Sequence, residues 1–259
     1  MSSALKAIEK DRTALLKICR QLDDSAWLLD SGCPGWSVQD VVSHMACSFW
    51  LAVDPSTLPG AGEVPGAGEL PGSGGLPAER AADRYVEARR SMTPEQVVAD
   101  YESVSLRGLE ALAEVAAQDL DIPLGDVGTY PASAMPSVFA FEAFVHIRYD
   151  LFPPGGPLAG KPPEADELLL GPTLDWIEVA LPQQNAGLLG GVRGAIEIDL
   201  DGLCPRKLRV GEGDAAARVT SDSQAFVRWI TQRSNWEELG VRAEGDPAAL
   251  GIIRRLRVF

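Results

Sequence analysis

Two proline-rich stretches divide the chain of 259 residues and limit what it can fold into. Residues 153–157 read Pro-Pro-Gly-Gly-Pro and residues 161–163 read Lys-Pro-Pro, so neither a helix nor a central strand continues through them. Apolar residues before this point recur at helical spacing, whereas several segments after it alternate as strands do. We therefore predict a helical domain over residues 1–152, a linker over 153–165, and an α+β domain over 166–259.

The first half carries clear helix signals. Ser37 is followed three residues later by Asp40, and Thr93 by Gln96, which is the spacing of a capping box at a helix start. Helices are predicted over these ranges: 3–22, 38–51, 78–91, 93–118 and 136–152. Residues 58–75 contain three six-residue Pro-Gly copies, which predict an insertion over 55–77 that is either an inert loop expansion or a lid.

The second half mixes both periodicities. Alternating residues predict strands over 196–200, 207–210, 217–220 and 241–244. Ser223 is predicted to cap one helix, and Asp246 followed by Pro247 to open another. We expect a few antiparallel strands covered by helices.

Composition excludes several classes of function. A formal charge of −14 and a pI near 4.6 argue against nucleic acid and anionic membranes as partners, since both attract basic surfaces. The first residues are charged at helical intervals, unlike a signal peptide, and no apolar run is long enough to span a bilayer, so we expect a cytoplasmic protein. We expect it to be a monomer or a homodimer. The cysteines form no Cys-x-x-Cys pair and are expected to be free thiols.

The two histidines of the chain, His44 and His146, are the candidate functional residues. Glu142 precedes His146 by four residues, which places both side chains on one face of a helix, where they can grip a divalent metal ion. His44 lies at the edge of the apolar stripe of its own helix, so it is expected to point into the bundle. The simpler alternative is two histidines that happen to lie in helices.

Several segments resemble one known family. Residues 33–44 (CPGWSVQDVVSH) and the Glu142-x-x-x-His146 helix followed by Asp150 look like the two halves of a motif of the mycothiol-dependent maleylpyruvate isomerase family, in the DinB-like superfamily. Residues 229–234 and 245–247 resemble segments of the second domain of that family, which is similar to sterol-carrier-protein folds.

The resemblance implies a DinB-like four-helix bundle in which His44, Glu142 and His146 bind a divalent metal, usually zinc. It also implies mycothiol as thiol cosubstrate, bound to the metal as a thiolate, and an isomerase or S-transferase acting on a small electrophile. Arg233 corresponds to a catalytic arginine that would hold a substrate carboxylate or a developing enolate. The alternative for Arg233 is a surface arginine paired with Glu237.

Some positions depart from the family pattern. Phe139 and Ala140 stand where an arginine is common, Asp150 falls one residue late, and Gln232 replaces a glycine. A dicarboxylate such as maleylpyruvate needs fixed cationic partners, so the missing arginine argues against that substrate. Two other classes stay open: a thiol-independent cyclase or rearrangement enzyme of secondary metabolism, and a non-catalytic binding module. The three intact metal-ligand positions count against the second.

Overall fold

The structure, a computed structural model, describes residues 1–54 and 82–259. The Pro-Gly insertion predicted over 55–77 therefore lies outside the described residues. The chain forms two compact units, Met1–Thr173 and Leu174–Phe259, and each is described by itself. The domain boundaries predicted from the sequence, with a linker over 153–165, stay a prediction.

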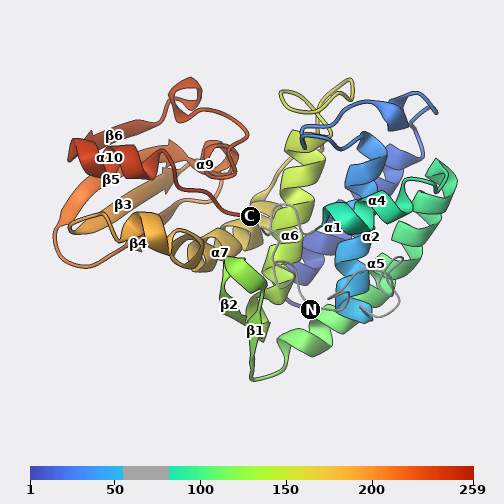
Figure 1. Ribbon diagram of the computed structural model, residues 1–259, viewed down its shortest axis with the longest axis horizontal. Helices are drawn as coiled ribbons and strands as arrows, with labels where there is room; N and C mark the ends of the chain where they lie inside the picture. Colours follow the sequence, from blue (N-terminus) through green and yellow to red (C-terminus); the bar gives the residue numbers. More distant parts are fainter. Residues whose placement is uncertain (55–81) are drawn as a thin grey trace. The chain divides into compact units, whose positions relative to one another are not determined.

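Helices dominate the first unit. Four of them pack against one another, with the shorter α4 (Asp83–Arg89) against α2 (Figure 1). The four are α1 (Ser3–Cys19), α2 (Val38–Val53), α5 (Pro94–Ala116) and α6 (Met135–Val145). Their apolar stripes supply the core, which includes the buried side chains of Ile8, Leu15, Val41, Tyr101, Leu112 and Phe144. The prediction of a helical first half is confirmed.

Both predicted capping boxes are present. The Ser37 hydroxyl accepts from the backbone N–H of Asp40, and the Asp40 carboxylate accepts from that of Ser37. Thr93 and Gln96 make the same reciprocal pair at the start of α5. Local sequence thus determines where α2 and α5 begin.

Two features of the first unit were not predicted. No strand was predicted in the first half, but the structure has a small antiparallel hairpin there, β1 (Asp121–Pro123) with β2 (Thr129–Pro131). Such short strands give too little alternation to be recognised. The helix expected over 136–152 is not α-helical throughout: after α6 it continues as the π-helical turn η5 (His146–Asp150), where the Leu151 N–H donates to the His146 carbonyl at 3.0 Å.

The second unit is built on a four-stranded sheet in the order β4-β3-β5-β6 (Figure 1). Its strands are β3 (Ala195–Asp201), β4 (Arg206–Val210), β5 (Ala215–Asp222) and β6 (Arg242–Gly245). The short helix α8 (Ala186–Leu189) precedes the sheet, and the other two helices are α9 (Ser223–Ile230) and α10 (Pro247–Ile253). Helix α7 (Glu167–Gln184) begins in the first unit and ends in the second. The prediction of a mixed second half is confirmed.

Two details of that prediction are wrong. The central pair, β3 with β5, is parallel, because the chain forms the β3–β4 hairpin and then crosses to the other side of β3. Alternation of apolar residues is the same in either direction, so the sequence could not distinguish them. The cap of α9 is Asp222, whose carboxylate accepts from two backbone N–H groups, and not Ser223. Asp246 caps α10 as predicted.

Among the described residues, no helix is long and apolar enough to cross a membrane. All of the cysteines are free thiols, as expected: Cys19, Cys33, Cys47 and Cys204.

Candidate metal and substrate site

The three predicted metal ligands lie together in the first unit. His44 comes from the middle of α2, Glu142 from the last turn of α6, and His146 is the first residue of η5. The His44 Nε2 atom lies 3.8 Å from a Glu142 carboxylate oxygen, and the centroids of the two imidazole rings are 5.0 Å apart, edge to face. Residues about a hundred positions apart in the sequence therefore form one cluster.

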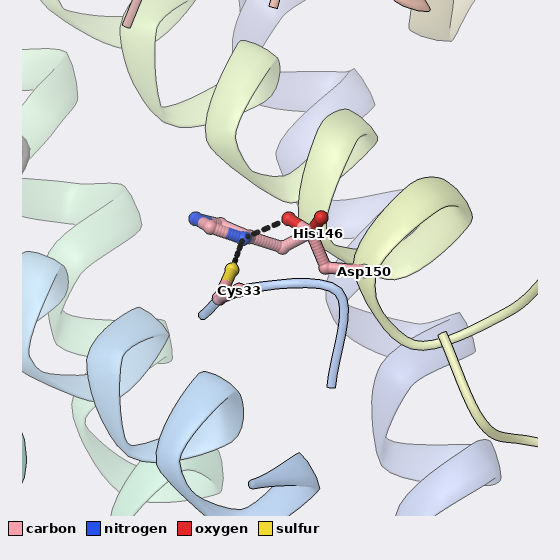
Figure 2. Close-up of side chains that lie close together, drawn as sticks. All are labelled: Cys33, His146 and Asp150. Atoms are coloured by element: carbon pink, nitrogen blue, oxygen red, sulfur yellow. Dashed lines mark hydrogen bonds and ion pairs between the residues drawn. The ribbon is translucent and has the colours of Figure 1, made fainter. Parts of the chain in front are cut away.

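The second nitrogen of His146 is held by a buried carboxylate. His146 Nδ1 lies 2.8 Å from Asp150 Oδ2, and the Asp150 side chain has no exposed surface. Figure 2 shows that the other ring nitrogen of His146 points away from Asp150. With Nδ1–H donating to Asp150, Nε2 is the nitrogen available to a metal ion.

A loop before α2 brings in a residue that the sequence did not single out. Gly32 donates its backbone N–H to the Asp150 carbonyl at 2.8 Å, and a Cβ on Gly32 would lie only 2.9 Å from the Asp150 Cα and Oδ1 atoms. The absence of a side chain lets this loop approach η5. Cys33 then places its sulfur 3.7 Å from His146 Nδ1 (Figure 2).

Among the described residues, the potential metal ligands that come together most tightly are Cys33, His146 and Asp150, whose donor atoms all lie within 4.8 Å of one another; His44, Glu142 and His146 are not grouped as closely. This group uses Nδ1 of His146, whereas the predicted group leaves Nδ1 to Asp150. Sequence reasoning missed Cys33 because 113 residues separate it from His146. Asp150 did carry a signal, since it follows His146 by the same four residues that separate Glu142 from His146.

Burial governs the electrostatics of the predicted group. Burial, together with the charge of His146, lowers the pKa of His44 to about 3, so its imidazole is neutral at physiological pH. Desolvation also raises the pKa of Glu142, whose side chain is 29% exposed, and the charge of His146 and a hydrogen bond with Ser48 offset only part of that rise. Burial alone would lower the pKa of His146, but the Cys33 sulfur and the Asp150 carboxylate offset it and raise that pKa to about 10.

One buried atom of the cluster has no partner. His44 Nδ1 is buried and makes no hydrogen bond among the residues that the structure describes. The Trp36 ring packs against the His44 ring with centroids 5.0 Å apart, and Trp36 is itself held by a hydrogen bond from its indole N–H to Asp83. The His44 ring is thus fixed by packing while its polar atoms stay largely unsatisfied.

A cavity of about 260 Å³ lies beside this cluster, and His44 and Glu142 form part of its wall. Most of its remaining lining is apolar and comes from α2, α5 and α6, including Leu51, Leu112, Val115, Met135, Val138 and Phe139. Such a cavity, apolar with a few polar groups converging at one side, is typical of a small-molecule site.

Residues 8–152 match the family described as mycothiol maleylpyruvate isomerase, N-terminal domain. The chain belongs to the mycothiol maleylpyruvate isomerase family. Two predictions are therefore confirmed: that the chain belongs to this family, and that it is an enzyme related to the isomerases of the family.

Two solved structures share the fold over 94% of this chain and 93% of theirs. Both are described as mycothiol-dependent maleylpyruvate isomerase, one of them a histidine-to-alanine mutant; the TM-scores are 0.60 for the mutant and 0.58 for the other, at 15% and 16% sequence identity. At such identity the likeness shows the fold alone. No curated protein matches the chain significantly.

Arg233 lies in the second unit, shortly after α9. Its Nη1 atom donates to the Thr231 carbonyl at 3.0 Å, and the preceding residue, Gln232, has a left-handed backbone with φ of 60°. Glu237, the alternative partner weighed for Arg233, pairs with Arg254 at 3.1 Å. The catalytic role of Arg233 stays a prediction.

Proposed function

We propose that this chain is a metal- and mycothiol-dependent isomerase or S-transferase that acts on a small electrophile. The first unit would be its DinB-like metal-binding bundle and the second a sterol-carrier-like domain. The observation that carries the proposal is the partly buried cluster of two imidazoles and one carboxylate at the wall of an apolar cavity.

The residues present fit a divalent metal ion. Two histidines and one glutamate are the donor set of many catalytic zinc sites, which keep one coordination position open. His44 Nε2 and the Glu142 carboxylate face each other at 3.8 Å, and the pKa of Glu142 is raised, so a cation between them would stabilise the carboxylate. Metal-bound histidines usually donate their other N–H to a carboxylate, as His146 does to Asp150.

The group of Cys33, His146 and Asp150 fits less well. A metal in this group would bind Nδ1 of His146, which now contacts Asp150 at 2.8 Å. Asp150 would then have to bind the metal itself, and no carboxylate would be left to orient the His146 ring. We therefore assign the metal to His44, Glu142 and His146, with Asp150 as the residue that orients His146. Zinc is the proposed ion because imidazole and carboxylate ligands in this number suit it.

A divalent metal at this position would lower the pKa of a bound thiol and so supply a thiolate nucleophile at neutral pH. The protein residues prepare the site for that chemistry. Asp150 fixes the orientation of the His146 ring, and Trp36 packs against His44. The apolar lining of the cavity excludes water around the electrophile. An isomerase would release the thiol again after rotation, whereas a transferase would keep it in the product.

Arg233 is proposed to stabilise a developing enolate oxygen through paired hydrogen bonds, as a guanidinium does well. The test is Arg233→Lys, which keeps the charge but not the planar fork. We expect a lower kcat at nearly unchanged metal content. Full turnover in this variant would rule out the paired hydrogen bonds.

The proposed function is tested by metal analysis and by thiol consumption in the same preparations. Purified protein is expected to contain about one divalent metal per chain and to consume mycothiol in the presence of an alkyl halide or an epoxide. His44→Ala and His146→Ala should lose both properties, and Cys33→Ala should keep both. Full metal content in both histidine variants would refute the assignment.

A further inference from the structure

We infer that the cavity beside His44 and Glu142 selects small uncharged apolar molecules, so that the substrate is an aromatic or branched aliphatic electrophile without a carboxylate. As a statement about the substrate this rests on the proposed function. As a statement about what the cavity binds it needs neither metal nor thiol.

The charges around the cavity support this selection in metal-free protein. Among the described residues that line it there is no lysine or arginine, and the Glu142 carboxylate repels anions unless a metal ion neutralises it. Away from a bound metal, a substrate carboxylate placed among the apolar side chains would be removed from water without an ionic partner, which costs far more than burying an apolar group gains. A substrate with two carboxylates is disfavoured most.

Two arginines lie close in sequence to Tyr85, which lines the cavity, but both are engaged elsewhere. Arg84 packs over the ring of Tyr85 at 4.8 Å and donates to its hydroxyl at 3.0 Å. Arg89 is buried and paired with Asp100. Neither guanidinium is part of the lining, so their charge is not presented to a bound molecule.

The size of the cavity sets the scale of the ligand. A closed apolar cavity of about 150 Å³ is enough to admit benzene. At about 260 Å³, this cavity has room for a benzene ring with a short substituent, or a branched chain of similar volume. The aromatic ring of Phe139 in the wall provides a surface for ring stacking.

Benzyl alcohol and benzoate test the inference, because they share a ring and differ mainly in charge. Binding of each to the full-length purified protein is measured by calorimetry or by ligand-observed NMR in the presence of a chelator, which removes the metal as a partner for benzoate. We expect benzyl alcohol to bind at least about tenfold more tightly than benzoate. Equal or tighter binding of benzoate, or no binding of either probe, would overturn the inference.

Three variants locate the binding. Ala52→Phe fills the cavity and is expected to weaken benzyl alcohol binding at least about tenfold, whereas Ala99→Phe, at an exposed position of α5, is not. Phe139→Arg adds a cation to the wall and should shift the preference toward benzoate, which keeps the test decisive if Ala52→Phe does not fold. Unchanged binding in a folded Ala52→Phe protein would place the probe elsewhere and refute the inference.

The same preparations separate this inference from the proposed function. Protein that lacks metal and mycothiol turnover but still prefers benzyl alcohol would refute only the proposed function. Protein with metal and turnover that prefers benzoate would refute only the inference about the substrate.

Discussion

Arg148 and His146 lie two residues apart in η5 but belong to two different polar clusters. The clusters differ in how completely their charged groups are paired. Arg148, in η5, makes a two-point ion pair with Asp11 of α1 at 2.8 and 3.0 Å, and both side chains are almost fully buried. Two residues earlier, His146 belongs to a cluster in which His44 and Glu142 approach only to 3.8 Å, beyond hydrogen-bond distance.

The difference separates a structural cluster from a functional one. In the Asp11–Arg148 pair each charge is neutralised by its partner, although Arg148 Nε makes no hydrogen bond among the described residues, and the pair joins α1 to η5. In the histidine cluster a neutral imidazole and a destabilised carboxylate face each other without a hydrogen bond. Buried polar atoms that stay unmatched are expensive unless a ligand completes them.

The largest expected effect comes from breaking the ion pair between Asp11 and Arg148. Asp11→Ala leaves the Arg148 charge buried without its partner, which should lower the free energy of unfolding by about 3–5 kcal/mol. Denaturation with urea measures this loss. His44→Ala, in metal-free protein, should change the same quantity by much less, because it removes a neutral ring whose Nδ1 has no partner.

The double variant Asp11→Leu/Arg148→Met provides the control for that experiment. Burial raises the pKa of Asp11 despite the neighbouring Arg148, so desolvation costs the pair more than its attraction returns. Replacing both residues by apolar ones should therefore restore most of the stability. A double variant as unstable as Asp11→Ala would show that the loss in Asp11→Ala does not come from the unpaired Arg148 charge.

Metal binding should stabilise the cluster of His44, Glu142 and His146 and should not affect the Asp11–Arg148 ion pair. At a free metal concentration of one hundred times Kd, binding adds about 2.7 kcal/mol to the stability of the folded protein. Thermal denaturation of wild-type protein should thus show a higher Tm with zinc than with a chelator. His44→Ala should show the same Tm in both conditions; a retained shift would mean that the metal binds elsewhere.

Asp150 is expected to affect metal affinity without binding the metal. Asp150→Asn removes the charged acceptor for His146 Nδ1–H, and loss of such an outer partner typically weakens metal binding about 10- to 100-fold. Competition with a fluorescent chelator measures the affinity, and circular dichroism checks the fold. Unchanged affinity in a folded variant would contradict the orienting role.

The effect of pH on the stability of metal-free protein depends on His146. The folded-state pKa of His146 is raised to about 10, above its ordinary value near 6.5. Its protonated form therefore contributes stability that is fully present below about pH 6.5 and is lost as the pH rises to about 10. Urea denaturation of the chelated protein between pH 6 and 10 should show this decline, and His146→Ala should show less of it.

Sequence alone predicted the parts of the molecule that local chemistry determines. The capping boxes at Ser37 and Thr93 and the alternating strands were visible because each depends on residues close in sequence. The candidate ligands His44, Glu142 and His146 were proposed from helical spacing and family resemblance, and their role as metal ligands stays a prediction.

What the sequence could not predict depends on tertiary packing. The close approach of Gly32 to the π-helical turn brings Cys33 beside the His146 imidazole. The parallel pairing of β3 with β5 likewise depends on a crossover, which strand periodicity does not encode.

X-ray absorption spectroscopy at the zinc edge tests the central claim, that His44, Glu142 and His146 hold the metal. We predict nitrogen and oxygen ligands only in thiol-free protein, with one sulfur ligand appearing when mycothiol is added. A sulfur ligand already present without mycothiol, and lost in Cys33→Ala, would contradict this account and assign the metal to Cys33, His146 and Asp150.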